Sequence, residues 1–516
     1  MIQIKGLHLT HKKDLRVILE KFDIVLNYGD KLAIIGEEGN GKSTLMKWLY
    51  APQLVEDYIE AEGERNLGNE RIGYLPQALP EKDKAKSLYE FFSEEDCFWN
   101  QTPNQLGDYA KQFGVKIEFF YSDQKVESLS GGERVKAQLI KLLMQEPTVL
   151  LLDEPSNDID IACLELLERI IHDWKYIVAY ISHDETLIEN TANRIVHIEQ
   201  IHRKTKSRFT VAEMDYQRYV AERENSFERQ MKQALSERKE KQIRDEKYRR
   251  VKDKVQTALD NCSRQSPSVA KNLKDKMHAV KSMGKRFEKQ DKNMMEIPEQ
   301  ESAIFFTIGN DKSGIPSGKT VLEYSLDALY SPDGKRLLSQ NIFLRIRGAE
   351  KICIVGANGA GKTTFIRDLA EKLLNRTDLK VEYMPQNYEE LLDFTMTPVD
   401  FLDKTGEKEE RTKIRTFLGS LKYTADEMEH PISELSEGQK AKVLLAKMAL
   451  SDANVLILDE PTRNFSPLSG PVIRKMIREF PGAVISISHD RKFIAEVCDK
   501  IYELKKDGLF ERQESM

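Results

Sequence analysis

Two glycine-rich runs, at residues 36–44 and 356–364, each place a lysine and a hydroxyl residue directly after their glycines. Glycines at this spacing let successive backbone N–H groups point into one concavity, as in a loop that holds nucleotide phosphates. The lysine would reach the β- and γ-phosphates, and Ser43 or Thr363 would hold Mg²⁺. The candidate ATP-binding residues are therefore Gly36, Gly39, Asn40, Gly41, Lys42, Ser43 and Thr44 in the first run, and Gly356, Asn358, Gly359, Ala360, Gly361, Lys362, Thr363 and Thr364 in the second.

An acidic pair follows an apolar run in each half of the chain, Asp153-Glu154 and Asp459-Glu460. Each aspartate ends the run and is placed to join a metal shell. Each glutamate could orient or deprotonate a water that attacks a phosphate. The pairs therefore predict two catalytic carboxylates, Glu154 and Glu460, beside two metal-binding ones.

Two further motifs recur with the same offset of 306 residues as the acidic pairs. Ser-His-Asp places His183 and His489 30 residues after the aspartates, where a histidine could contact the γ-phosphate. Leu-Ser-Gly-Gly-Glu and Leu-Ser-Glu-Gly-Gln each open a basic helix, so that a serine hydroxyl and backbone amides form a second anion site. The residues of this second site are Ser130, Gly131 and Gly132 in the first copy and Ser436 and Gly438 in the second.

Short continuous apolar runs precede the motifs, as expected of parallel strands that are covered on both faces. Helix-like stretches alternate with them, which predicts an α/β lobe in each half. The runs are residues 32–35, 149–152 and 177–181 in the first half and 352–355, 455–458 and 483–487 in the second.

The segment between the two halves has a different pattern. Residues 214–260 contain no Gly or Pro, and a polar break at 261–268 separates them from a second helical pattern. Two helices around a short turn predict an antiparallel hairpin whose apolar stripe is its own seam. The stripe comprises Phe227, Met231, Leu235, Ile243, Tyr248, Val251, Val255 and Leu259, then Val269, Leu273, Met277, Val280, Met283 and Phe287. We place the domains at 1–212, 213–296 and 297–516.

Charge is unevenly distributed along the 516 residues. Residues 221–290 contain 20 Lys and Arg against 11 Asp and Glu, a balance of +9 in a chain whose net charge is −6. A basic segment between two acidic lobes indicates a polyanionic partner. The five cysteines form no Cys-x-x-Cys pair, so we expect buried apolar thiols, no metal cluster and a reducing compartment, the cytoplasm. No uncharged apolar run reaches the length of a membrane span.

Together with Gln77 and Gln386, which follow Leu-Pro and Met-Pro, these motifs resemble those of the ATP-binding cassette (ABC) ATPases. The resemblance covers both lobes and implies that they pair head to tail, with one ATP between the phosphate loop of each lobe and the Leu-Ser-x-Gly of the other. It also implies that both glutamines join the Mg²⁺ sites, directly or through water. The implied metal set is Ser43, Gln77 and Asp153 at one site and Thr363, Gln386 and Asp459 at the other. Tyr330, and His11 similarly placed, are candidates to stack on adenine.

Two cassettes fused through a basic helical hairpin resemble the ABC-F family of ribosome-associated ATPases. That resemblance implies a chain that pairs its own cassettes as a monomer. It also implies that the hairpin enters the tRNA exit region of the large ribosomal subunit and meets rRNA and tRNA. Such contacts would read RNA shape and backbone rather than sequence. The candidate RNA-binding residues are Lys241, Arg244, Lys247, Arg249, Arg250, Lys271, Lys274, Lys276 and Lys281.

Several alternatives remain at this point. Within ABC-F, the protein would either displace antibiotics from the large subunit or rescue stalled ribosomes. Some members of that family carry a long extra arm between the glutamine and the Leu-Ser-x-Gly run. The small gap between Gln77 and Ser130 leaves room for a short arm or none. Outside ABC-F, the alternatives are an ATPase subunit of a membrane transporter, a DNA-maintenance ATPase, and a hairpin that serves only as a solvated spacer.

One departure from the family is clear: the Asn-x-x-Asp turn is present at Asn157 to Asp160 but not after Pro461. The two sites are therefore expected to be unequal.

Overall fold

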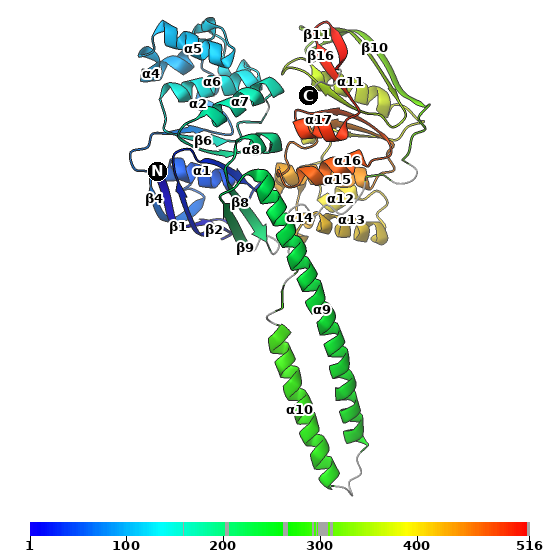
Figure 1. The fold of residues 1–516 in the computed structure, drawn as a ribbon. Helices are drawn as coiled ribbons and strands as arrows, with labels where there is room; N and C mark the ends of the chain where they lie inside the picture. Colours follow the sequence, from blue (N-terminus) through cyan, green and yellow to red (C-terminus); the bar gives the residue numbers. More distant parts are fainter. Residues whose placement is uncertain are drawn as a thin grey trace. The chain divides into compact units, whose positions relative to one another are not determined.

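The computed structural model describes residues 1–157, 159–201, 206–261, 267–291, 294–295, 297, 308–309 and 313–512. At residues 267–270 it describes the backbone alone. The chain divides into two compact units, one made of residues 1–216 with 301–516 and the other of residues 217–300. The first unit contains both α/β cassettes, and the second is helical (Figure 1). Across these described ranges, no helix combines the length and the apolar character required to cross a membrane.

The first cassette is built on a six-stranded sheet of order β5-β6-β7-β3-β8-β9. Its strands are β3 (Lys31–Ile35), β5 (Ile72–Leu75), β6 (Val149–Asp153), β7 (Ile177–Ile181), β8 (Arg194–Ile201) and β9 (Lys206–Ala212). The first five pair in parallel and β9 is antiparallel to β8. Every residue of β3, β6 and β7 is buried, as their continuous apolar runs predict.

The second cassette repeats this arrangement in a sheet of order β13-β14-β15-β12-β16-β17. Its strands are β12 (Lys351–Val355), β13 (Val381–Met384), β14 (Val455–Asp459), β15 (Ala483–Ile487), β16 (Lys500–Lys505) and β17 (Gly508–Arg512). The three central strands are again fully buried. The carboxyl ends of these parallel strands therefore bring both acidic pairs and both histidines to one edge of their sheets.

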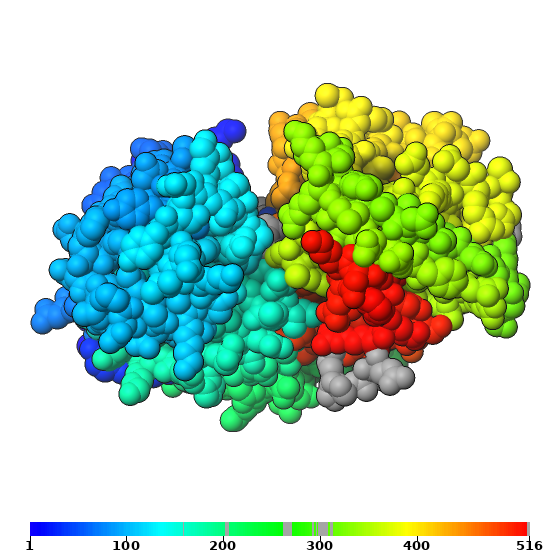
Figure 2. Space-filling model, turned by 90° about the horizontal axis from the view of Figure 1, so that it is seen from above, coloured from blue at the N-terminus to red at the C-terminus, as the bar shows by residue number. Residues whose placement is uncertain are grey.

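Antiparallel strands and helices complete each cassette. The first has the sheet β2-β1-β4, and the second has the pair β10-β11. These strands are β1 (Ile2–His11), β2 (Val17–Leu26), β4 (Ile59–Asn66), β10 (Thr320–Tyr330) and β11 (Leu337–Arg347). The helices that the sites use are α1 (Lys42–Tyr50), α6 (Gly131–Met144), α7 (Ile161–Asp173) and α8 (Glu185–Thr191), then α11 (Lys362–Leu374), α15 (Glu437–Ala449), α16 (Gly470–Arg478) and α17 (Arg491–Val497). Figure 2 shows one face of the molecule, with the first cassette in blue to teal and the second in light green to red.

Smaller helices lie between the glutamine and the Leu-Ser-x-Gly run of each cassette. They are α2 (Glu81–Lys84), α3 (Leu88–Ser93), α4 (Asp96–Trp99) and α5 (Pro103–Phe113) in the first, and α12 (Pro398–Leu402), α13 (Lys408–Ser420) and α14 (Ala425–Glu429) in the second. Both sets include helices that begin at capped residues, for example Ser87 before α3 and Thr424 before α14. Neither set contains a long helical arm among its described residues.

The helical unit consists of α9 (Tyr216–Asp260) and α10 (Pro267–Asp291), as the periodicity predicts. Tyr248 and Phe287 meet edge to face, with ring centroids 5.8 Å apart. Gly284 leaves room for this contact, because a Cβ there would lie 2.5 Å from the Tyr248 hydroxyl. The guanidinium of Arg244 lies over the Phe287 ring and pairs with Asp291.

The predicted apolar stripe is only partly a seam. Met277 and Val280 are buried, whereas Leu235, Ile243, Val251 and Met283 are 39–53% exposed. A pair of helices covers a narrower face of each partner than a globular core does, so residues at the stripe's margin remain in solvent. The prediction for these four residues is therefore wrong.

The cysteine prediction also holds only in part. Cys163 and Cys353 are buried, but Cys97 and Cys498 are half-buried. Cys262 lies outside the described residues. Burial raises the pKa of the Cys163 thiol to about 11, which suits an unreactive packing role.

Candidate active sites

Each phosphate loop joins a buried central strand to a helix, β3 to α1 and β12 to α11. Equivalent glycines adopt the same left-handed backbone: φ is 142° and 151° at Gly36 and Gly356, and 89° and 97° at Gly41 and Gly361. A Cβ on Gly36 would lie 2.2 Å from the carbonyl oxygen of Ile198. The loops therefore require glycine both for their backbone angles and for the close approach of the neighbouring strand.

The two loop lysines are buried and turn back onto their own loops. Lys42 Nζ donates to the carbonyl oxygens of Gly36 at 2.7 Å and Glu37 at 3.0 Å. Lys362 Nζ donates to the equivalent oxygens at 2.8 and 3.1 Å. Both ammonium groups are thus held against carbonyl oxygens of their own loops, and burial lowers the pKa of Lys362.

The acidic pairs stand at the ends of β6 and β14, next to the loops. Ser43 Oγ donates to Asp153 Oδ1 at 2.8 Å, and the Tyr74 hydroxyl donates to Oδ2 at 3.1 Å. In the second cassette, both carboxylate oxygens of Asp459 are buried and accept no hydrogen bond from any residue that the structure describes. Burial raises the pKa of Asp459 to about 6. A buried carboxylate without donors beside a hydroxyl residue suits Mg²⁺, which prefers such oxygens.

Glu154 and Glu460 share an unusual backbone. Both have positive φ, 52° and 54°, which is rare for residues with a side chain. Their N–H groups donate to Ile181 and Ile487 at the ends of β7 and β15, at 3.1 and 3.0 Å. Such strain costs about 1–3 kcal/mol and persists where the surrounding structure enforces it. The two glutamates are therefore turned out of their strands by the same local geometry.

The side chain of Glu154 is fully engaged. It accepts hydrogen bonds from Gln77 at 2.7 Å and Asn157 at 2.5 Å, and its Oε1 lies 3.3 Å from His183 Nε2. Burial alone would raise its pKa, but His183, Lys42 and Asn157 outweigh burial and hold the pKa of Glu154 at about 2. This carboxylate is therefore ionised at neutral pH.

Glu460 has a different environment although its backbone is the same. The backbone N–H of His489 donates to its Oε2 at 3.2 Å, but His489 Nε2 is 3.8 Å from Oε1. Burial, followed by the charge of Asp459, raises the pKa of Glu460 to about 8. Burial, followed by the charge of Lys362, lowers the pKa of His489 to about 4. The second acidic pair therefore holds one proton at neutral pH beside an uncharged histidine.

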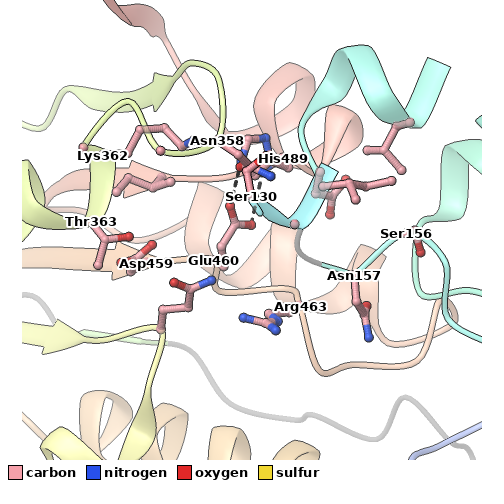
Figure 3. Close-up of a pocket in the computed structure, with 18 of the residues that line it drawn as sticks. Ser130, Ser156, Asn157, Asn358, Lys362, Thr363, Asp459, Glu460, Arg463 and His489 are labelled. Atoms are coloured by element: carbon pink, nitrogen blue, oxygen red, sulfur yellow. Dashed lines mark hydrogen bonds and ion pairs between the residues drawn. The ribbon is translucent and has the colours of Figure 1, made fainter. Parts of the chain in front are cut away.

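A cavity of about 490 Å³ lies against the second phosphate loop, and residues of both cassettes line it. Figure 3 shows Lys362, Asp459, Glu460 and His489 on one side, with Ser130 approaching from the first cassette. Further lining residues include Gly131, Ser156, Asn157, Asn358, Gly359, Gly361, Thr363, Thr364, Gln386 and Arg463. The expected cross-pairing of the second loop with the first Leu-Ser-x-Gly is thus present in the geometry.

The first phosphate loop meets the second Leu-Ser-x-Gly through direct contacts. The backbone N–H of Gly438 donates to the carboxylate of Glu38, and Lys442 Nζ pairs with Glu37 at 2.9 Å. A separate cavity of about 310 Å³ lies beside Lys42, Ser43, Thr44, Gln77 and Glu154, and His11 lines it too. His183 Nδ1 lies 2.6 Å from the carbonyl oxygen of Phe465 in the opposite cassette.

Some predicted residues take other positions. Tyr330 does not line the second cavity, whose nearby wall is Ser331, Pro332 and Leu338; its side chain is 51% exposed. The Asn40 side chain donates to the carbonyl oxygen of Ile198 at 3.0 Å and so braces the loop. Gly132 packs against Cys163.

Sequence reasoning singled out the turn at Asn157 to Asp160, but it gave no role to Glu37, Glu38 or Tyr74. Glu37 and Glu38 contact the opposite cassette, and Asp160 accepts a hydrogen bond from the Asn358 N–H at 3.4 Å. Tyr74 binds Asp153, and Asn157 binds Glu154. The acidic character of the first loop was the one visible signal, because two glutamates occupy positions that are Ala357 and Asn358 in the second loop.

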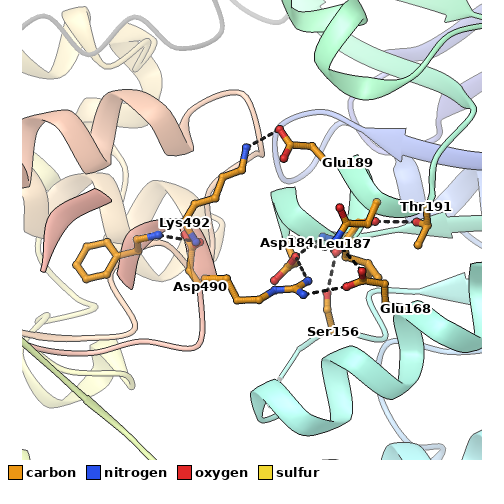
Figure 4. Close-up of polar contacts among 12 residues, drawn as sticks. Ser156, Glu168, Asp184, Leu187, Glu189, Thr191, Asp490 and Lys492 are labelled. Atoms are coloured by element: carbon orange, nitrogen blue, oxygen red, sulfur yellow. Dashed lines mark hydrogen bonds and ion pairs between the residues drawn. The ribbon is translucent and has the colours of Figure 1, made fainter. Parts of the chain in front are cut away.

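Charged pairs also join the cassettes beyond the sites. Arg491 of α17 pairs with Glu168 at 2.9 Å and with Asp184 at 3.4 Å. Lys492 pairs with Glu185 at 3.0 Å. It also pairs with Glu189 at 2.5 Å (Figure 4). Basic groups of the second cassette thus face acidic groups of the first.

The candidate RNA-binding residues lie on the helical unit, where most are exposed. Lys241 and Arg244 are exceptions, since both pair with Asp291 of α10. These two residues therefore tie α9 to α10. The exposed ones are Lys247, Arg249, Arg250, Lys271, Lys274, Lys276 and Lys281.

Comparisons with known proteins agree with this architecture. The family model described as "ABC transporter" matches residues 19–157 and 339–463. The chain is 27% identical to the ABC transporter ATP-binding protein YfmM of Bacillus subtilis, over 96% of both chains. It is 24% identical to human ATP-binding cassette sub-family F member 3, over 96% of this chain and 70% of that one.

A solved structure supports the same fold. The complex of an archaeal ribosomal stalk protein with the ribosome recycling factor aABCE1 aligns with a TM-score of 0.59 at 18% identity, over 98% of this chain and 90% of that one. Two matched cassettes, the repeated motifs and the sub-family F relatives agree with one another. The chain therefore belongs to the ABC transporter family, as an ATPase with two cassettes, and its relatives include sub-family F members.

Proposed function

We propose that this protein is a ribosome-bound ATPase whose cassettes close around two ATP molecules and thereby present the helical hairpin to ribosomal RNA. The observation that carries the proposal is the cavity at the second phosphate loop, whose walls come from both cassettes. A nucleotide held there would contact Lys362 of one cassette and Ser130 of the other. Binding energy would thus favour the closed pair, and hydrolysis would release it.

The site residues divide into positioning and chemical roles. The loop amides with Lys42 or Lys362 would hold the β- and γ-phosphates. Mg²⁺, when bound, would neutralise phosphate charge; Ser43 with Asp153 and Thr363 with Asp459 would hold it, assisted by Gln77 and Gln386. Ser130, Gly131, Ser436 and Gly438 would bind the γ-phosphate from the opposite cassette.

The glutamates would supply the chemistry. Glu154 and Glu460 would orient the attacking water and accept its proton, and His183 and His489 would stabilise the terminal phosphate. Glu154 already lies within 3.3 Å of His183 and is ionised. Glu460 must first lose its proton, so the two sites should differ in rate.

The ribosome as partner rests on the hairpin and the relatives together. Exposed Lys and Arg on both helices would neutralise phosphates, the interaction that contributes most of the affinity for nucleic acid. Human sub-family F member 3 is a relative that matches nearly all of this chain, and aABCE1, which has the same fold, is a ribosome recycling factor. We further propose that the hairpin reaches the tRNA exit region of the large subunit and displaces antibiotics bound there, with rescue of stalled ribosomes as the alternative.

The double variant Glu154→Gln with Glu460→Gln tests this proposal. With ATP it should remain on ribosomes during sedimentation, because both sites bind nucleotide but neither transfers the proton. The matched control, Lys42→Ala with Lys362→Ala, should stay unbound, since its loops cannot hold ATP. Sedimentation with membranes or DNA instead of ribosomes would contradict the proposal.

A second measurement separates the two ribosomal roles. Purified protein is added to in vitro translation inhibited by an antibiotic of the large subunit. Antibiotic displacement predicts that the inhibitor concentration for half inhibition rises. Stall rescue predicts no change there, but faster peptide release from a stalled message.

A further inference from the structure

The first phosphate loop carries two carboxylates at the interface between the cassettes. The backbone N–H of Gly438, in the first turn of α15, donates to the carboxylate of Glu38. Lys442, one turn further along α15, pairs with Glu37 at 2.9 Å, and these two side chains are only 13% and 22% exposed. An acidic loop thus occupies the anion-binding end of a helix that belongs to the opposite cassette.

At the second site the acidic side chain belongs to a turn rather than to the phosphate loop. There the loop offers Asn358, whose N–H donates to Asp160 in the turn of the first cassette. The residue equivalent to Asp160 in the second cassette is Ser466, which is buried and contacts Ser469 at 3.2 Å. Each interface therefore contains an acidic residue. At the second site this residue is Asp160 of the turn, and at the first site it is Glu38 of the phosphate loop.

This difference matters because, under the proposed function, the Gly438 amide and the first loop would face the terminal phosphate. When the Gly438 N–H donates to the carboxylate of Glu38, it is not available to donate to a γ-phosphate. The carboxylate also adds negative charge in a partly buried place, where screening is weak. A nucleoside diphosphate lacks the terminal phosphate and does not need this amide, so it meets less of the conflict.

We propose that Glu38 makes the first site discriminate against the γ-phosphate, so that this site prefers diphosphate relative to the second site. ATP binds there only when its γ-phosphate displaces Glu38 from Gly438. At the second site the equivalent loop side chain is the uncharged Asn358, so a triphosphate there does not have to displace a carboxylate of the loop itself. This inference rests on the assignment of the two nucleotide sites made under the proposed function.

The test isolates the first site with Lys362→Ala and then replaces Glu38 with Asn, the residue of the second loop. Affinities for Mg²⁺-ATP and Mg²⁺-ADP are measured by titration calorimetry. ATP should bind about tenfold more tightly after Glu38→Asn, the equivalent of one charge-assisted hydrogen bond regained. ADP affinity should change less than about twofold, since ADP makes no such contact.

The mirror variant, Asn358→Glu in a Lys42→Ala background, should weaken ATP binding at the second site by a larger factor than ADP binding. Glu38→Gln keeps the side-chain length without the charge, and gives the same readout if Glu38→Asn fails to fold. Equal changes for ATP and ADP, or no change for ATP, would overturn the inference. If Lys42→Ala with Lys362→Ala still binds ATP, the assignment of the sites fails instead.

Discussion

At the residue scale, the two catalytic candidates have one backbone and two electrostatic environments. Glu154 and Glu460 both adopt positive φ. Only Glu154 accepts hydrogen bonds from the side-chain amides of Gln77 and Asn157 and lies close to a histidine ring. Burial without those donors keeps Glu460 protonated near neutrality. Identical motifs therefore do not imply identical proton affinity.

The rate at each site should depend on pH in its own way. Only an ionised carboxylate accepts the proton of water, so activity rises as pH increases through the glutamate pKa. Glu154→Gln leaves the second site, whose Glu460 has a pKa of about 8, so its ATPase rate should climb from neutral to mildly alkaline pH. Glu460→Gln leaves Glu154, with a pKa of about 2, and its rate should be flat there. Parallel pH profiles of the two variants would contradict the assignment.

Two glycines of the first loop test the role of close packing. Gly36 and Gly39 both have positive φ, but only Gly36 faces a backbone atom, the carbonyl oxygen of Ile198, at clashing distance. Gly39→Ala should cost about 1–2 kcal/mol of unfolding free energy, from backbone strain alone. Gly36→Ala should cost clearly more, because β8 must move as well. Denaturant titration of both variants measures the difference, and equal losses would show that strain alone matters.

At the scale of elements, local pattern predicts more than contact does. The buried strands and both phosphate loops follow from the sequence, since continuous apolar runs and glycine spacing are local features. The exposed Leu235 and Ile243 on α9 do not, because periodicity shows a stripe but not how much of it the partner helix covers. The Glu38–Gly438 contact joins residues 400 positions apart, and no local pattern contains it. The pKa values likewise depend on burial that only the fold provides.

The hairpin should bind RNA through its exposed basic residues rather than through those that tie its two helices together. Replacing Lys247, Arg249, Arg250 and Lys276 with Gln should weaken ribosome binding and flatten its salt dependence. If all four contact phosphates, the slope of log K against log salt should fall by about 3 to 4. Sedimentation binding at several salt concentrations measures this slope.

The matched control replaces four basic residues nearer the start of α9. Arg229, Lys232, Arg238 and Lys239 carry the same total charge, and Lys232 already pairs with Glu228. A smaller loss in this control would place the RNA contacts toward the C-terminal end of α9 and the first half of α10. Equal losses would instead indicate non-specific attraction to the whole helical unit.

At the scale of the whole molecule, the two cassettes are similar in fold but opposite in charge where they meet. The positions equivalent to Arg491 and Lys492 in the first cassette are Glu185 and Thr186, 306 residues earlier. Arg474 of α16 adds a further pair with Glu185 at 2.9 Å, and its side chain is only 3% exposed. A duplicated fold has thus acquired one heteropolar interface that fixes which faces of the cassettes meet.

Reversing that interface should separate the cassettes without destroying either. Arg491→Glu with Lys492→Glu would place like charges against Glu168 and Glu189, which costs several kcal/mol. ATPase activity should fall about tenfold or more, because such an energy shifts the closed population by at least that factor. The distance between labels on α8 and α17 should lengthen, while each cassette retains nucleotide binding. The compensating swap, with Glu168→Lys and Glu189→Lys added, should restore part of the activity, since it re-forms two of the four ion pairs with their charges exchanged, while Asp184 and Glu185 still face like charges. Lost activity with an unchanged label distance would show that these charges serve the chemistry rather than the closure.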